Sequence, residues 1–221
     1  MRRLKGKVRA VVFDMDGVIV DSMPYHFLAW YEALRPLGVR VSCFDVYSKE
    51  GERWDKSLKD FLRHAKIKPT RKILKQIFLL RQKIFRKYFK RLLFKGAEEF
   101  LNCLKEKYRL GLVTGTPTVE LNRILPKRVK RLFESIVAGD HVKKGKPHPA
   151  PYLQAAKNLG VLPRECMVVE NAPYGIESAK RAGMFCVAVT TSLPKEYLKK
   201  ADIVVENLEE ISGIIDRGCK I

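Results

Sequence analysis

Short apolar runs, separated by longer segments, recur along the chain. The runs are rich in Val and Ile and show little polar alternation, a pattern that is typical of parallel strands buried on both faces. Because helix-length segments separate them, we predict an α/β fold with a doubly wound parallel sheet. The predicted strands cover residues 8–13, 110–113, 135–138, 166–169, 185–189 and 203–205.

Residues 21–94 follow a different pattern, without a comparable strand run. A long amphipathic helix is indicated by apolar residues that step by three or four, namely Ile73, Ile77, Leu80, Ile84 and Tyr88. An earlier helix is indicated in the same way by Phe27, Trp30, Tyr31 and Leu34. We therefore predict an α-helical domain over residues 21–94, inserted into an α/β domain that consists of residues 1–20 and 95–221.

Positive charge is concentrated in this insert. The 221 residues include 44 Lys and Arg against 24 Asp and Glu, which gives a formal net charge of +20. Residues 53–95 hold 16 basic and two acidic side chains, or +14 of that total. Such a charge favours anionic partners such as phosphoesters, nucleic acid or acidic lipid headgroups. Exposure of a helical face to solvent explains most of these residues. Only a minority of them are then available to contact a ligand.

The composition predicts a soluble, cytoplasmic protein. The five cysteines are dispersed and form no C-x-x-C pair, which favours reduced thiols over a disulfide framework. Only a brief apolar stretch follows the basic residues at the start of the sequence, so we expect no signal peptide. No run approaches the roughly 18 apolar residues that a membrane-spanning helix needs, so we expect no membrane partner.

Asp14 and Asp16 carry the strongest chemical signal. They follow the first apolar run, and side chains two residues apart lie on one face of a strand that persists through Met15. Two carboxylates in one small volume repel each other unless one holds a proton or a divalent cation lies beside them. Gly17 permits an abrupt turn at the carboxyl end of the strand, where open α/β sheets bind ligands. The Asp-x-Asp-Gly pattern also occurs in plain turns without chemistry.

Two further segments combine a strand or loop with groups that suit a phosphate. Thr114 and Gly115 follow a predicted strand and precede a helix, so a hydroxyl and free N–H groups are available for a phosphate oxygen. Lys146 precedes a proline and is therefore expected in an extended loop, from which its ammonium group can reach Asp14. An ordinary helix cap and a solvated loop cation are the plain alternatives.

Glu170 and Asn171 repeat the arrangement of the first motif. They follow the apolar run at 166–169, and their oxygen atoms are of the kind that Mg²⁺ binds. A loop with a helix cap is again the plain alternative. The carboxyl ends of parallel strands meet at one edge of a sheet, and the agreement among the four segments favours a single site there.

In combination, the motifs resemble those of the haloacid dehalogenase superfamily, in the branch of phosphatases and beta-phosphoglucomutases that has a helical cap inserted after the first strand. Four signatures occur in order and span nearly the whole chain. They are Asp14-Met15-Asp16-Gly17-Val18 with Asp21-Ser22, then Thr114, then Gly145-Lys146-Pro147, and then Glu170-Asn171. The resemblance implies a Rossmann-like α/β core with an inserted α-helical cap domain that closes over the site.

The resemblance also implies catalytic roles. Asp14 is the nucleophile, which attacks phosphorus and forms an aspartyl-phosphate, and Asp16 is the general acid and then the general base. Thr114, Gly115 and Lys146 hold the phosphoryl oxygens.

Mg²⁺ is the implied cofactor. Its implied ligands are Asp14, Asp16 through its backbone carbonyl, Glu170 and Asn171. Asn171 departs from the family pattern, in which this position usually carries Asp. An amide oxygen still ligates Mg²⁺, but one negative charge is lost, so we expect weaker metal binding unless Glu170 compensates directly or through water.

The resemblance extends to residues of the cap that bind substrate. His26 occupies a position where a His contacts the acid/base Asp, although a simply packed His is an equal alternative. Gly51 keeps the Gly of the second cap motif, whereas Trp54 takes the place of an Arg that binds the non-transferring phosphate in the mutase. Arg53 is the adjacent candidate to replace that Arg, and Lys83 is one of many candidates for a substrate-binding Lys.

We therefore predict a Mg²⁺-dependent phosphatase that hydrolyses a small phosphorylated metabolite through an aspartyl-phosphate. A phosphosugar mutase of the same fold is the alternative. A nucleic-acid-binding protein, which would use the basic cap with Trp54 and Tyr88 as stacking groups, is a distant third because it leaves the four motifs unused.

Overall fold

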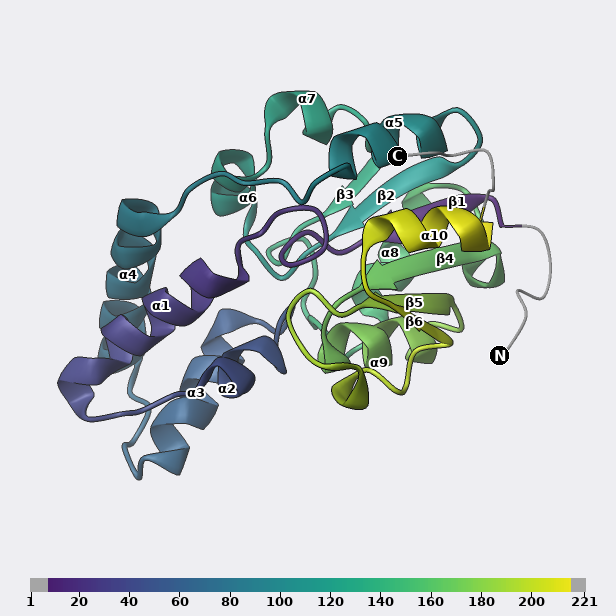
Figure 1. The fold of residues 1–221 in the computed structure, drawn as a ribbon. Coiled ribbons are helices and arrows are strands. Elements are labelled where there is room, and N and C mark those ends of the chain that lie inside the picture. The colour runs from purple at the N-terminus through teal and green to yellow at the C-terminus, as the bar shows by residue number, and fades with distance from the viewer. Residues whose placement is uncertain (1–7, 216–221) are drawn as a thin grey trace.

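The computed structural model describes residues 8–215, which form a six-stranded parallel sheet flanked by helices (Figure 1). The strand order is β3-β2-β1-β4-β5-β6. The sheet confirms the predicted α/β fold, and each strand lies within two residues of its predicted position. The strands are β1 (Ala10–Phe13), β2 (Arg109–Val113), β3 (Ser135–Val137), β4 (Cys166–Glu170), β5 (Phe185–Val189) and β6 (Ile203–Val205).

Alternate residues of the strands supply two separate apolar cores, one on each face of the sheet. In β1, Val11 and Phe13 belong to the first core, whereas Ala10 and Val12 belong to the second. The first core is covered by α5 (Ala97–Lys105), α6 (Thr118–Ile124), α7 (Lys127–Lys130) and α10 (Leu208–Ile215). The second is covered by α8 (Ala150–Asn158) and α9 (Pro173–Arg181). Burial on both faces explains why the strands read as continuous apolar runs.

Four helices between β1 and α5 lie apart from the sheet (Figure 1). They are α1 (Met23–Leu34), α2 (Cys43–Tyr47), α3 (Trp54–His64) and α4 (Arg71–Tyr88). They enclose a third apolar core, in which Trp30, Leu58 and Ile77 are buried. We call α1–α4 and their connections the cap. The domain limits at residues 21 and 94 stay a prediction.

The chain enters and leaves the cap at neighbouring points. Val20 forms an isolated antiparallel bridge with Leu93. The Asp21 N–H donates to the Leu92 carbonyl at 2.9 Å, and the Phe94 N–H donates to the Ile19 carbonyl at 3.0 Å. The two connections are therefore joined to each other by backbone hydrogen bonds.

Three short 3₁₀ helices lie in the connections between the other described elements. They are η1 (Arg35–Leu37), η2 (Pro163–Glu165) and η3 (Lys195–Tyr197).

Within residues 8–215, no helix combines the length and apolar character that crossing a membrane would require.

The cysteines differ in part from the expectation of reduced thiols. Cys43, Cys166 and Cys186 are free, but Cys103 is engaged in a disulfide bond, and Cys219 lies outside the described residues. The spacing of the cysteines along the chain could not reveal this bond, because the spacing does not show which thiols the fold brings together.

Candidate active site

Asp14 stands at the carboxyl end of the central strand. Strand β1 ends at Phe13 rather than persisting through Met15, and the Asp14 N–H still donates to the Val169 carbonyl of β4 at 3.0 Å. The strand thus ends at its predicted position and does not persist through Met15, the condition under which Asp14 and Asp16 would lie on one face of it. The chain turns at Gly17, where φ is +82°. A Cβ atom at this position would overlap the Asn171 side chain, so both the conformation and the close approach require glycine.

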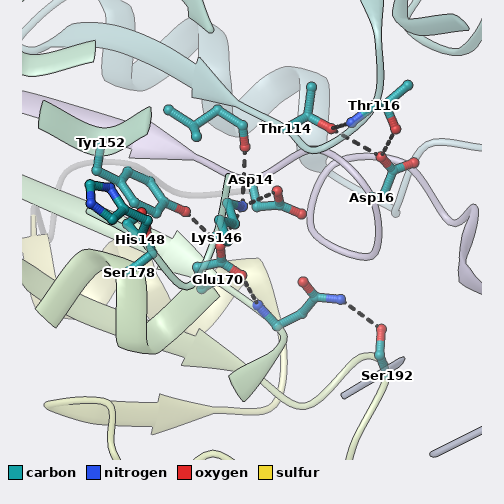
Figure 2. Close-up of polar contacts among 12 residues, drawn as sticks. Asp14, Asp16, Thr114, Thr116, Lys146, His148, Tyr152, Glu170, Ser178 and Ser192 are labelled. Atoms are coloured by element: carbon teal, nitrogen blue, oxygen red, sulfur yellow. Dashed lines mark hydrogen bonds and ion pairs between the residues drawn. The ribbon is translucent and has the colours of Figure 1, made fainter. Parts of the chain in front are cut away.

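Lys146 lies between two carboxylates at this edge of the sheet (Figure 2). Its Nζ donates to Asp14 Oδ1 at 2.5 Å and to Glu170 Oε1 at 2.6 Å, and its side chain is 1% exposed. Tyr152 also donates to Glu170 Oε1, at 2.5 Å. The structure therefore brings together three residues that the sequence had placed in one site, and it adds Tyr152.

Burial and neighbouring charges set the protonation states of Asp14 and Lys146. Burial raises the pKa of Asp14 well above its ordinary value, and Glu170 adds to the rise while Lys146 opposes it. Burial alone would lower the pKa of Lys146, but Asp14 and Glu170 raise it above its ordinary value. The ammonium form of Lys146 is thus retained in a water-poor site, where it can hold an anion.

The loop that carries Lys146 is fixed at several points. Ser178 of α9 donates to the His148 carbonyl at 2.7 Å, and His148 Nδ1 accepts from the Ala150 N–H at 3.1 Å. Arg53 of the cap donates to the Val142 carbonyl at 3.3 Å. Core and cap therefore both hold this loop in place.

Asp16 accepts four hydrogen bonds and is fully buried. Ser22 at 2.6 Å and His26 Nε2 at 3.0 Å contact Oδ1, and Thr114 at 3.2 Å and Thr116 at 2.9 Å contact Oδ2 (Figure 2 shows the two threonines). Burial alone would raise the pKa of Asp16, but the His26 imidazole and the hydroxyls bring it to about 2. Without a ligand, Asp16 is therefore an ionised carboxylate.

The tautomer of His26 follows from its second neighbour. Arg81 Nη2 lies 2.6 Å from His26 Nδ1, and a guanidinium group can only donate. Nδ1 must therefore accept, which leaves the proton on Nε2 to be donated to Asp16. Arg81 in turn donates to Glu120 of the core at 3.1 Å. A chain of buried polar contacts thus connects Asp16 with the cap and returns to the core.

Two oxygen atoms in the site suit a metal ion. Among residues 8–215, no group of three or more His, Cys, Asp and Glu residues is placed to hold a metal. However, Asp14 Oδ2 and Asn171 Oδ1 are buried without a hydrogen-bond partner. One carboxylate and one amide oxygen are a sufficient protein contribution for Mg²⁺, which usually keeps several waters. These two residues therefore fit the cofactor.

Other predicted metal ligands are engaged elsewhere. Both carboxylate oxygens of Glu170 accept hydrogen bonds, from Lys146 and Tyr152 on one side and from the Asn171 N–H at 3.1 Å on the other. The Asp16 carboxylate is likewise occupied, so only its backbone carbonyl remains as a candidate ligand. The amide of Asn171 is oriented by Ser192, which accepts from Nδ2 at 2.8 Å.

A turn of the cap projects into the site. Gly51 has φ +78°, and a Cβ atom there would overlap the Lys146 side chain. A Cβ atom on Gly115 would in turn lie 2.8 Å from the Gly51 backbone. Glu50 is adjacent, and burial raises the pKa of its carboxyl. The cap is therefore closed on the core.

Three further residues that were predicted to bind substrate, namely Arg53, Trp54 and Lys83, lie in different parts of the cap surface. Trp54 lines a small, partly open cavity beside Asp16. Arg53 instead pairs with Asp55 at 3.2 Å and lines a separate open cleft of about 470 Å³. Lys83 is exposed. The assignment of Lys83 is corrected, because Arg81, two residues earlier on α4, lies on the buried face that Lys83 cannot share.

Four residues of the site were not predicted from the sequence, namely Thr116, Arg81, Glu120 and Tyr152. Arg81 carried a usable signal, because it is four residues from both Ile77 and Phe85 and thus falls on the apolar stripe of α4. A charged residue in such a stripe is seldom buried without a partner. Glu120 and Tyr152 carried no comparable signal, since their partners are distant in the chain.

The chain combines a parallel α/β sheet, an inserted cap, and a Lys between two carboxylates at the end of the central strand, which is the candidate active site. The chain belongs to the haloacid dehalogenase-like hydrolase family, whose model matches residues 8–183. The protein is therefore a hydrolase of this family.

Relatives of similar length support this placement. The chain is 31% identical to beta-phosphoglucomutase of Bacillus subtilis over 93% of this chain and 92% of that protein. It is 29% identical to a phosphorylated carbohydrates phosphatase of Thermotoga maritima, over 94% and 98%. The structure of a putative beta-phosphoglucomutase from Bacteroides vulgatus superposes with a TM-score of 0.85 at 30% identity, over 97% of this chain and 91% of that one.

Proposed function

We propose that this protein is a Mg²⁺-dependent phosphatase that hydrolyses a small phosphate monoester through a phosphorylated Asp14. The observation that carries the proposal is the arrangement of Asp14. One of its oxygens is held by Lys146, and the other is buried without a hydrogen-bond partner. A carboxylate oxygen left open beside a fixed cation is suited to attack a bound phosphoryl group.

The reaction divides into two displacements. In the first, Asp14 Oδ2 forms a bond to phosphorus, the bond from phosphorus to the leaving oxygen breaks, and Asp16 gives that oxygen a proton. In the second, Asp16 takes a proton from water, the water oxygen bonds to phosphorus, and the bond to Asp14 breaks. The products are the alcohol and inorganic phosphate, and both carboxyl groups return to their initial state.

Asp16 must gain a proton before the first displacement. Its pKa of about 2 in the ligand-free site means that this proton arrives with the substrate. A phosphate placed next to Asp16 raises the pKa of the carboxyl by charge repulsion. The hydroxyls of Thr114 and Thr116 rotate freely and can turn from Asp16 toward an anion.

Asn171 would hold Mg²⁺ through its unpartnered amide oxygen. Asp14 would contribute the oxygen that does not attack, Oδ1, which has a second lone pair besides the one that accepts from Lys146. When bound, the ion supplies positive charge that offsets the negative charge shared by the phosphate and Asp14. Lys146 supplies a second positive charge beside Asp14, and it orients the carboxylate before substrate arrives.

Phosphate release from a panel of phosphate monoesters tests the proposal. We expect release that depends on Mg²⁺, stops with EDTA, and falls by roughly a thousandfold or more in Asp14→Asn, because the amide is not a nucleophile. Glu209→Gln, which changes an exposed carboxylate on α10, is the matched control. Acid-quenched wild-type enzyme should carry a phosphoryl group that Asp14→Asn lacks, and its absence at all times would contradict the covalent route.

A phosphosugar mutase is the second candidate, favoured by the relationship to beta-phosphoglucomutase. Incubation with beta-glucose 1-phosphate and a trace of the bisphosphate separates the two activities. Glucose 6-phosphate as the product indicates a mutase, whereas inorganic phosphate alone indicates a phosphatase. Salt-sensitive binding of an oligonucleotide that survives Asp14→Ala would instead support the nucleic-acid alternative.

A further inference from the structure

A small, partly open cavity lies between cap and core beside Asp16. Its volume is about 50 Å³. His26 and Thr116 form part of its wall, and both also contact the Asp16 carboxylate. If Asp16 protonates the leaving oxygen, as the proposed function states, the group attached to that oxygen lies in this cavity.

The charged side chains in the wall of the cavity already have partners. Arg81 pairs with Glu120 at 3.1 Å, Lys49 pairs with Asp60 at 3.0 Å, and Glu52 pairs with Lys56 at 2.7 Å. The remaining carboxyl group belongs to Glu50, and burial raises its pKa, which favours the neutral form. A second phosphate or a carboxylate on the leaving group would therefore find no free cation among these wall residues to offset its charge.

The cavity also offers a donor and an acceptor that need a partner. Arg81 Nε and Glu120 Oε1 are buried without a hydrogen-bond partner, and both residues line the cavity. A buried polar group without a partner costs free energy. A hydroxyl group satisfies both atoms, because it accepts from Nε–H and donates to Oε1. A ligand with several hydroxyls therefore matches this wall.

Size sets a further limit. A cavity of about 50 Å³ holds roughly four waters, at about 10–15 Å³ of probe volume for each. Trp54 is stacked on Phe78 with ring centroids 3.8 Å apart and gives the cavity a rigid aromatic wall. A short polyol fits this space, whereas a six-membered sugar ring requires the cap to move outward.

We propose that the substrate is the monophosphate of a short, uncharged polyol of about three carbons, and that the enzyme discriminates against leaving groups with a second anionic group. This inference rests on the proposed function and names its substrate class. It also favours a hydrolase over a mutase, because a mutase intermediate carries two phosphates and one of them would occupy a cavity whose wall has no free cation.

A matched pair of substrates tests the charge selection. Glycerol 3-phosphate and 3-phosphoglycerate have the same number of carbons and differ in whether the far end is a hydroxymethyl or a carboxylate. We expect kcat/KM for glycerol 3-phosphate to be higher by roughly tenfold to a hundredfold, the effect of one unfavourable group in a binding pocket. Glucose 6-phosphate tests the size limit and is expected to be poorer than glycerol 3-phosphate.

Two variants report on the wall itself. Glu52→Gln keeps the shape of a side chain that accepts from Ser57 at 2.7 Å. It should reduce the ratio of kcat/KM for glycerol 3-phosphate to kcat/KM for 3-phosphoglycerate by several-fold. Trp54→Ala enlarges the cavity and should raise the relative rate with glucose 6-phosphate. Each ratio is measured within one protein, so a partly unfolded variant still gives a valid value.

The outcomes separate this inference from the proposed function. Equal or higher kcat/KM for 3-phosphoglycerate or glucose 6-phosphate in the wild-type protein would overturn the inference, while Asp14-dependent hydrolysis would still support a phosphatase. If none of these substrates nor p-nitrophenyl phosphate releases phosphate with Mg²⁺ present, both the inference and the proposed function are overturned.

Discussion

Asn171 is a departure from the pattern that the resemblance implies, in which this position usually carries Asp. Its amide oxygen is buried without a hydrogen-bond partner, and its amide nitrogen donates to Ser192. Because Ser192 can also donate, an Asp at position 171 would keep this contact. A carboxylate would then face the proposed metal site with no change in shape.

Asn171→Asp should bind Mg²⁺ more tightly, by roughly tenfold, because it adds a negative charge to the ligand set. Without metal, the same charge repels Asp14 and Glu170, so the variant should unfold at a lower denaturant concentration in EDTA than the wild type. Calorimetric titration with Mg²⁺ and denaturation with and without the metal measure the two effects. Unchanged or weaker metal affinity would remove Asn171 from the set of ligands.

Asp16 makes the stability of the fold depend on pH. Its folded-state pKa is about 2, below the ordinary value of 3.8, so its ionised form stabilises the native state. That contribution is complete above about pH 4 and is lost as the pH falls through 2.

Asp16→Asn should therefore lower the free energy of unfolding by about 2 kcal/mol at pH 7, and by less at pH 3. Urea denaturation in EDTA at the two pH values measures this difference. A deficit that is the same at both would show that the four hydrogen bonds, rather than the charge, account for the stability contributed at this position.

At the scale of elements, α4 of the cap and α6 of the core are connected by a buried ion pair. Arg81 and Glu120 are 9% and 4% exposed in their side chains. Breaking such a pair from one side leaves a buried charge uncompensated and typically costs about 3–5 kcal/mol, whereas replacing both partners with apolar residues is often nearly neutral.

Arg81→Met and Glu120→Leu should each lower the free energy of unfolding by a few kcal/mol, and the double variant should recover most of that loss. Chemical denaturation of the four proteins forms the required cycle. Activity should stay low in the double variant, because His26 loses the donor that fixes its tautomer. Strict additivity of the two stability changes would contradict coupling between these residues.

The turn of the cap at Gly51 gives a second prediction at this scale. Gly51→Ala adds a methyl group against Lys146 at a positive φ, so it should hinder cap closure and reduce kcat/KM by roughly a hundredfold. Gly38→Ala is the matched control, because Gly38 also has a positive φ (+70°) but lies in open space. Similar losses of activity in the two variants would attribute the effect to backbone strain alone.

Sequence reasoning located the elements better than the contacts between them. The six strands and the long helix at Ile73–Tyr88 have strong local patterns, and the structure differs from them by two residues at most. The pairing of Lys146 with Asp14 followed from the common edge of a parallel sheet. The pairing of Arg81 with Glu120 did not, because the orientation of the cap depends on tertiary packing that no local pattern encodes.

At the scale of the whole molecule, charge is distributed unevenly between core and cap. Residues 53–95 contribute +14 of the formal +20. A basic cap beside the site should attract anionic substrates from solution, so kcat/KM should fall as salt rises. We expect kcat to change little, because the buried site is screened much less. Steady-state kinetics between about 20 and 300 mM NaCl test this, and a fall in kcat alone would contradict steering.

The hydrogen-bonded connections between cap and core restrict how the molecule can open. Asp21 and Phe94 tie the outgoing and returning chain together, so the cap is attached at one place rather than at two separate anchors. Opening by rotation about this single attachment would move Gly51 away from Lys146 and Gly115. The same geometry lets α1–α4 be exchanged for a short loop without separating the ends of the core that they now join.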